Sequence, residues 1–201
     1  MIGGVFMKEL RNEKLLAKSK SLFHNVLELK KLNIDNNYCA NLLDWFNEIA
    51  LKNIAIHKSR KSKIQINQEL YKKSRQSVYW INFGRNIGSE FQGYHYAVVL
   101  YESKYTAIVV PLTSKKEHDP LWIEENKDAI VDLGVVSGYP NESKECYACV
   151  FMLQTVSKKR LDRCGNKTTG YFNIKISDEQ MKSICDKINK ITYHTIKDID
   201  K

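Results

Sequence analysis

Three polar residues of types that carry out acid–base and phosphate chemistry lie close together in the middle of the chain: Glu90, His95 and Thr113. A histidine titrates near neutral pH, so beside a carboxylate it can take up or release a proton during a reaction. A threonine hydroxyl can donate a hydrogen bond to an oxyanion. The alternatives are that His95 is a strand residue whose imidazole is hydrogen-bonded within the fold, and that Glu90 is a purely structural loop carboxylate.

Short strands are expected to position these residues. The segments Ser77–Phe83, Tyr94–Tyr101 and Tyr105–Leu112 are rich in aromatic and β-branched residues, which predicts three strands. The loop Gly84–Gly93 between the first two contains three glycines, and its spacing fits neither a Walker A loop nor a dinucleotide-binding motif. Because Pro111 lacks a backbone donor, we expect it at a strand end or a sheet edge.

Further strands and one helix are predicted toward the C-terminus. The segment Leu121–Glu124 predicts a weak strand, Tyr147–Leu153 a stronger one, and Tyr171–Ile176 another. Ser177 is expected to cap a final helix, whose apolar positions begin with Met181. Many short strands followed by one helix predict an α+β domain with a small, strongly bent sheet or barrel.

The N-terminal part has a different pattern. Apolar residues recur at helical spacing, which predicts a helical hairpin over roughly residues 8–55. Its role is open between a packed pair with a solvated face and a helix that binds a partner or a second copy. We therefore divide the chain into a helical extension 1–57, a basic linker 58–76 and a strand-rich domain 77–201.

The positive charge is concentrated in the N-terminal part. Of the net charge of +9, residues 1–77 carry 15 Lys and Arg against 7 Asp and Glu, a net of +8, and the remainder carries 17 against 16. Such a surplus favours a polyanionic partner such as nucleic acid. There is no apolar run of membrane-spanning length, and five scattered cysteines suit a reduced, cytoplasmic setting. Cys146 and Cys149 would face opposite sides of a strand, so we expect no zinc site.

Two blocks of sequence resemble one known family. The run Val78–Lys115 (VYWINFGRNIGSEFQGYHYAVVLYESKYTAIVVPLTSK) is similar to the core of the PemK/MazF family of toxin endoribonucleases, with its G-S-E loop and its strand ending in Pro-Leu-Thr-Ser. The block Phe151–Leu161 (FMLQTVSKKRL) is similar to a later segment of that family. The resemblance covers about residues 77–195 and leaves the N-terminal helices unexplained.

The resemblance implies a fold and an activity. The fold would be a small SH3-like β-barrel with a C-terminal helix, here preceded by the helical hairpin. The protein would be a cytoplasmic homodimer with a cognate protein antitoxin and no membrane attachment. It would cut single-stranded RNA, without metal or other cofactor, by attack of the ribose 2′-hydroxyl on the adjacent phosphate.

The resemblance also implies roles for individual residues. Thr113 matches a catalytic threonine, whereas His95 stands where the family has a catalytic arginine, and Tyr96 replaces the proline after it. We expect His95 to be the principal acid–base group and Glu90 to orient it or to act as the base. The residues expected to contact RNA are Arg85, Ser89, Lys115, Lys116, Gln154, Lys158 and Arg160.

Two alternatives belong to other functional classes. The same barrel occurs in CcdB-like toxins, which bind DNA gyrase and perform no chemistry. A catalytically inactive relative that binds RNA or protein is the other, because the expected arginine is missing. The G-S-E loop and the Pro-Leu-Thr strand end favour the nuclease.

Overall fold

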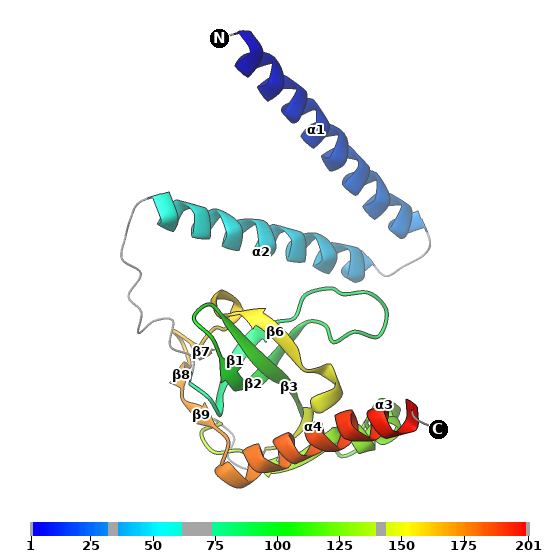
Figure 1. Ribbon diagram of the computed structural model, residues 1–201, viewed down its shortest axis with the longest axis vertical. Helices are drawn as coiled ribbons and strands as arrows, with labels where there is room; N and C mark the ends of the chain where they lie inside the picture. Colours follow the sequence, from blue (N-terminus) through cyan, green and yellow to red (C-terminus); the bar gives the residue numbers. More distant parts are fainter. Residues whose placement is uncertain (1, 32–35, 62–73, 140–143, 200–201) are drawn as a thin grey trace. The chain divides into compact units, whose positions relative to one another are not determined.

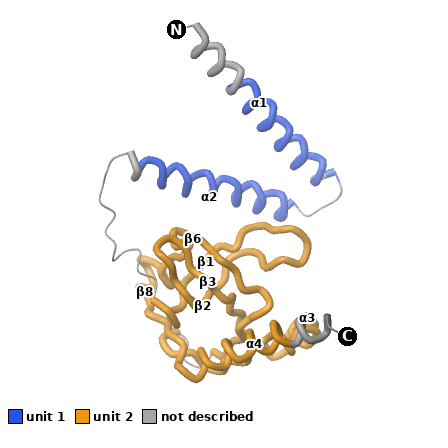
Figure 2. Tube along the Cα trace, viewed as in Figure 1, with its two compact units in different colours: residues 1–58 blue, residues 59–201 orange. Residues whose placement is uncertain are grey.

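The computed structural model describes residues 2–31, 36–61, 74–139 and 144–199. The chain divides into two compact units, residues 1–58 and residues 59–201 (Figure 2). Among the described residues, none of the helices contains an apolar stretch long enough to cross a membrane.

The first unit consists of two long helices, α1 (Ile2–Lys31) and α2 (Asn36–Lys61). Helices were predicted here, and they extend beyond the expected 8–55 at both ends. Val26 and Cys39 are buried, but Phe23 is well exposed on α1, as is Ile54 on α2. Among the residues of these helices whose burial is described, most of the large apolar side chains are therefore exposed. Of the predicted basic linker 58–76, residues 62–73 lie outside the described residues.

The second unit is built on a curled antiparallel sheet (Figure 1). Its strands follow the order β4-β5-β3-β2-β1-β9, and β6 also pairs with β3. The bounds are β1 Ser77–Asn82, β2 Tyr94–Glu102, β3 Thr106–Ser114, β4 Ile130–Val135, β5 Glu145–Cys149, β6 Gln154–Ser157 and β9 Ile174–Lys175. A separate hairpin is formed by β7 (Cys164–Asn166) and β8 (Gly170–Phe172), and the chain ends in α4 (Asp178–Ile199). The predicted bent sheet with a C-terminal helix, preceded by N-terminal helices, is confirmed.

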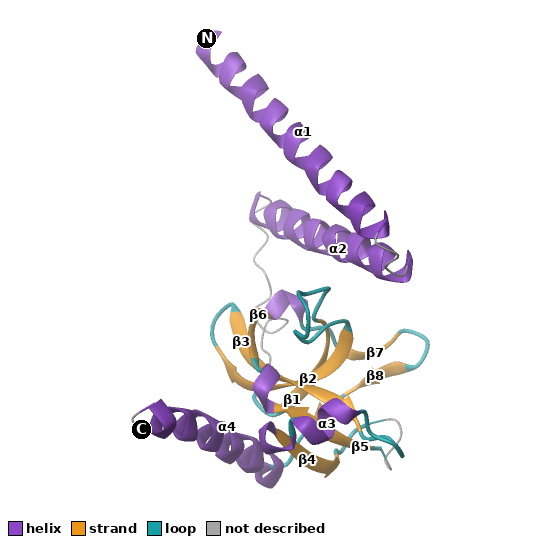
Figure 3. Cartoon of the chain, turned by 90° about the vertical axis from the view of Figure 1, so that its right-hand side faces the viewer, coloured by secondary structure: helices purple, strands orange, loops and turns teal. Residues whose placement is uncertain are grey.

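The sheet has an apolar cluster on each face. On one face Val98, Val110 and Ala148 pack with the buried residues Met181 and Ile184 of α4. On the other face Ala97, Val109 and Ile81 pack with residues of β6 and of the loop after β1. Figure 3 shows α4 on one side of the sheet, with that loop and β6 on the other. Because successive strand residues point to opposite faces, the two clusters use alternate positions of the same strands.

Pro111 lies in the interior of β3, contrary to the expectation of an edge or an end. It is buried and faces Ala97 of β2. On the opposite side, β3 pairs with β6 as far as Val109 and with β5 from Leu112 onward. Pro111 lies in the gap between these two partners, where the sheet needs no backbone N–H donor from β3. A central strand can therefore accommodate it.

Three other strand predictions need correction. Leu121–Glu124 belongs to a short helix, α3 (Leu121–Glu125), in which only Ile123 is buried, so the run lacks the alternating burial of a strand. The segment predicted from Tyr147 leaves the sheet after Cys149 and passes through a 3-10 turn, Val150–Met152, because the chain must bend there to reach β6. The segment predicted over 171–176 is divided between β8 and β9, and β4 was not predicted.

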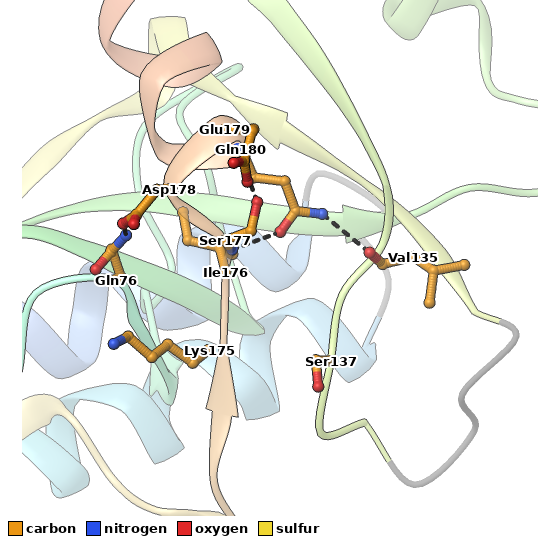
Figure 4. Close-up of a pocket in the computed structure, with 9 residues that line it drawn as sticks. All are labelled: Gln76, Val135, Ser137, Lys175, Ile176, Ser177, Asp178, Glu179 and Gln180. Atoms are coloured by element: carbon orange, nitrogen blue, oxygen red, sulfur yellow. Dashed lines mark hydrogen bonds between the residues drawn. The ribbon is translucent and has the colours of Figure 1, made fainter.

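The start of α4 is held by the expected capping interactions. The Ser177 hydroxyl accepts a hydrogen bond from the Gln180 backbone at 3.2 Å, and the Gln180 side chain accepts one from the Ser177 backbone at 2.8 Å. The Gln180 amide also donates to the carbonyls of Leu133 and Val135, at 2.7 and 2.9 Å. A pocket lies beside this cap (Figure 4), and the dashed bonds drawn there join Ser177 to Gln180, Gln180 to Val135 and Gln76 to Asp178. This pocket is therefore bordered by groups that hold α4 to β4.

We expect Ser177→Ala to lower the free energy of unfolding by about 1 kcal/mol, the usual contribution of a helix N-cap. Gln180→Ala should cost more, about 2 kcal/mol, because it also leaves two strand carbonyls without their donor. Urea unfolding followed by tryptophan fluorescence measures both. Ser183→Ala is the matched control, since its hydroxyl only bonds an exposed carbonyl within α4. Equal losses for the Ser177 and Ser183 variants would contradict the role of the cap.

Candidate active site

His95 and Thr113 are brought together by the pairing of β2 with β3. The register joins Tyr96 to Leu112, and continuing it by one residue places His95 opposite Thr113. Facing residues of adjacent antiparallel strands have Cβ atoms about 4.5–5.5 Å apart. Both side chains are half-buried, on the face that also carries Ala97 and Val109. The two residues singled out from the sequence therefore lie side by side, although 18 positions separate them in the chain.

The row continues across the sheet on both sides of this pair. Ile81 of β1 faces His95 on one side. On the other side Thr113 faces Tyr147 of β5, and Tyr147 faces Asp132 of β4. The result is a line of polar side chains that begins beside an apolar residue and ends at a carboxylate.

Burial determines the charge of His95. Its ring packs on Phe91, with ring centroids 4.3 Å apart, and lies 6.4 Å from the Phe83 ring. Desolvation by this burial lowers the pKa of His95 below its ordinary value, although hydrogen bonds to the backbone of Gln92 and Leu112 act in the opposite direction. At neutral pH the imidazole is therefore uncharged and can accept a proton.

The loop between β1 and β2 places Phe91 against His95. Its two ends are joined by hydrogen bonds from Phe83 to the Gly93 carbonyl, at 2.7 Å, and from Gly93 to the Gly84 carbonyl, at 2.8 Å. The Asn86 side chain donates to the carbonyls of Phe83 and Phe91, at 3.3 and 2.8 Å. Gly84 and Gly93 have φ angles of 92° and 79°, which glycine adopts without strain. The loop is thus an organised element that buries one side of the histidine.

The predicted loop residues lie on the exposed part of this element. Ser89 and Glu90 are exposed, and Arg85 is half-buried. The His95 ring is hydrogen-bonded to the backbone of Gln92 and Leu112. Both roles expected of Glu90, orienting His95 and acting as the base, stay predictions.

Tyr147 is a member of the row that sequence reasoning missed. Its neighbours Cys146 and Ala148 are buried in the cluster under α4, so the Tyr147 ring points to the His95 face. Its hydroxyl donates a hydrogen bond of 2.7 Å to the Asp119 carboxylate, which also accepts one of 2.9 Å from the Lys116 backbone. No motif marked Tyr147 in the sequence; the only signal was its place in a predicted strand.

Lys115, which was expected to contact RNA, is held by two carboxylates. Its ammonium lies 2.8 Å from Asp132 and 2.9 Å from Glu145, and 5.6 Å from the centre of the Tyr147 ring. Hydrogen bonds to both carboxylates raise its pKa. Lys115 therefore joins β3 to β4 and β5 and also lies beside the row.

Two residues of the second motif block have structural contacts. Lys158 is only 6% exposed and forms an ion pair of 2.5 Å with Glu102, so its burial does not support the predicted RNA contact. Arg160 donates a hydrogen bond of 2.7 Å to the Asn82 carbonyl at the end of β1. Gln154 is half-buried and faces Val109, which puts it on the His95 face.

The strand-rich part of the chain is similar to one family of known proteins. The family model of PemK-like, MazF-like toxins of type II toxin–antitoxin systems matches residues 74–192. The structure of MazF (Form-I) from Deinococcus radiodurans is similar with 14% identity and a TM-score of 0.38, over 60% of this chain and 96% of that one. The MazE–MazF structure (Form-II) from the same organism gives 13% identity and a TM-score of 0.37, over 60% and 95%. No curated protein sequence matches the chain.

The lowered pKa of His95 predicts how stability depends on pH. Below the ordinary histidine value of 6.5 the unfolded chain binds a proton that the folded chain does not, so the free energy of unfolding should fall as the pH drops below about 6.5. Urea unfolding at a series of pH values measures this fall. His95→Gln should reduce it, whereas His118→Gln, at an exposed position, serves as the matched control. The same fall in His95→Gln as in the wild type would show that another group is responsible.

Proposed function

The chain belongs to the family of PemK-like and MazF-like toxins of type II toxin–antitoxin systems, and we propose that it is an endoribonuclease that cleaves single-stranded RNA. The observation that carries the proposal is the pairing of His95 with Thr113 on one face of adjacent strands. A neutral imidazole and a hydroxyl at that separation suit the two sides of a phosphate group. The resemblance adds the expectation that the reaction uses neither metal nor cofactor.

The proposed reaction is an internal transfer of the phosphate. His95 removes the proton from the ribose 2′-hydroxyl, and the 2′-oxygen forms a bond to phosphorus. Thr113 donates a hydrogen bond to a non-bridging oxygen, where negative charge increases in the transition state. The bond from phosphorus to the 5′-oxygen breaks, and that oxygen takes a proton from the imidazolium or from water. The products are a 2′,3′-cyclic phosphate and a 5′-hydroxyl.

The histidine changes the chemistry expected of this family site. An arginine stays charged at every relevant pH and is a poor base, whereas a histidine can exchange a proton near neutrality. The lowered pKa of His95 keeps it in its basic form at neutral pH. The aromatic contact with Phe91 therefore supports the role of base more than that of a permanent cation.

The proposal extends to partners and location. We propose that a cognate protein antitoxin regulates the chain, as the family's type II systems imply, that the chain forms a homodimer, and that it acts on RNA in the cytoplasm. We propose that five residues contact the RNA: Arg85, Ser89, Lys116, Gln154 and Arg160. Lys115 would also contact the RNA where the substrate takes the place of Asp132 or Glu145 beside its ammonium.

Cleavage of a long single-stranded RNA in the presence of EDTA tests the function. We expect wild-type protein to produce 5′-hydroxyl ends, and His95→Ala to reduce the rate about 10²- to 10⁴-fold. Thr113→Val should reduce it about 10²-fold, as expected for a lost oxyanion donor. His118→Ala is the control for loss of an exposed histidine. Intact RNA with tight, salt-sensitive binding would instead indicate a non-catalytic binder, and inhibition of gyrase would indicate the other toxin class.

The rate should also depend on pH through His95. We expect it to rise with pH through the lowered pKa of His95, below 6.5, and to be level near neutrality, because only the uncharged ring accepts a proton. His95→Arg restores the family residue and should remove this rise if the variant is active. A rise that persists in His95→Arg would assign the titration to a different group.

A further inference from the structure

The row that carries His95 and Thr113 does not end at the residues of the proposed reaction. Tyr147 faces Thr113 across the ladder between β3 and β5, on the same side of the sheet. With facing Cβ atoms about 4.5–5.5 Å apart, a phosphate bound between His95 and Thr113 would lie within one side chain of the Tyr147 ring. The nucleotide attached to that phosphate would therefore reach it.

The ring is fixed before any ligand arrives. Its hydroxyl is bound to Asp119, and Asp119 is bound in turn by the Lys116 backbone. The Lys115 ammonium lies 5.6 Å from the ring centre and is itself held by Asp132 and Glu145. A ring held on several sides loses little conformational freedom when a ligand packs on it.

The same contacts argue against two other roles. The bond to Asp119 raises the pKa of Tyr147 to about 12, so the phenol is a poor proton donor to a leaving oxygen. Two carboxylates, Asp132 and Glu145, pair with the Lys115 ammonium, and a third, Asp119, accepts from the Tyr147 hydroxyl. This excess of negative charge over Lys115 disfavours a phosphate there. A neutral, flat group remains as the ligand that suits this end of the row.

We propose that Tyr147 is a positioning residue whose ring stacks on the nucleobase next to the scissile phosphate. The inference rests on the proposed nuclease function. Stacking on an aromatic side chain tolerates any base, so Tyr147 would set the position of the nucleotide more than its identity.

Binding of a short single-stranded RNA of mixed sequence tests the inference. The RNA carries 2′-O-methyl groups throughout, so it cannot react, and its affinity for the full chain is measured by fluorescence anisotropy at several salt concentrations. We expect Tyr147→Leu to weaken binding about tenfold or more, and Tyr147→Phe, which keeps the ring, to stay within about twofold of wild type. The slope of log Kd against log salt should be unchanged in both, because no phosphate contact is lost. Tyr101→Leu, at an exposed tyrosine of β2, is the matched control.

Several results would overturn the inference. These are wild-type affinity in Tyr147→Leu, a loss in Tyr147→Phe as large as in Tyr147→Leu, or a smaller salt slope, which would mean a phosphate contact. If Tyr147→Leu does not fold, Tyr147→Met of similar volume takes its place with the same expected loss. Cleavage of unmodified RNA separates the two proposals: cleavage with unaltered binding by the Tyr147 variants refutes only the stacking role. Weakened binding by those variants without cleavage by the wild type refutes only the nuclease.

Discussion

The hydrogen-bonded register of β2 against β3 determines which side chains can act together in this protein. A shift of one residue would move His95 to the face covered by α4 and would leave Thr113 on the other. The register is held by apolar residues on both faces, since Val98 and Val110 pack under α4 while Ala97 and Val109 pack on the opposite side. Both faces of these strands must be buried, so the pairing that builds the core also brings together the residues of the candidate site.

Burial also lowers the pKa of His95 in the candidate site. The loop after β1 folds back on itself and places Phe91 against His95, which keeps the imidazole uncharged at neutral pH. At the position where the resemblance implies an arginine, this chain has a titratable group in a surrounding that favours its basic form. Burial against Phe91 disfavours a charged side chain at this position. An arginine would stay charged there, whereas a histidine can be neutral, so the aromatic contact suits the histidine.

Two lysines that were expected to contact RNA have structural partners instead. The strand-rich part is nearly neutral overall, and two of its cations, Lys115 and Lys158, lie in ion pairs that join neighbouring segments. These lysines hold β3, β4 and β5 together, or bind the turn after β6 to β2. Most of the net positive charge of the chain resides before β1.

The sequence by itself determined the alternating strands around His95, the helical spacing of the N-terminal segment, the cap of α4 and the family to which the motifs point. These features are local, because each depends on side chains a few positions apart. Only the tertiary structure decided that Pro111 fits a central strand, that the segment after Cys149 leaves the sheet, and that Tyr147 and Asp119 join the row beside Thr113. It also decided that Lys158 is buried in an ion pair. Each of these depends on which strands pair and on what each side chain meets after the chain folds, and residues far apart in the sequence supply those partners.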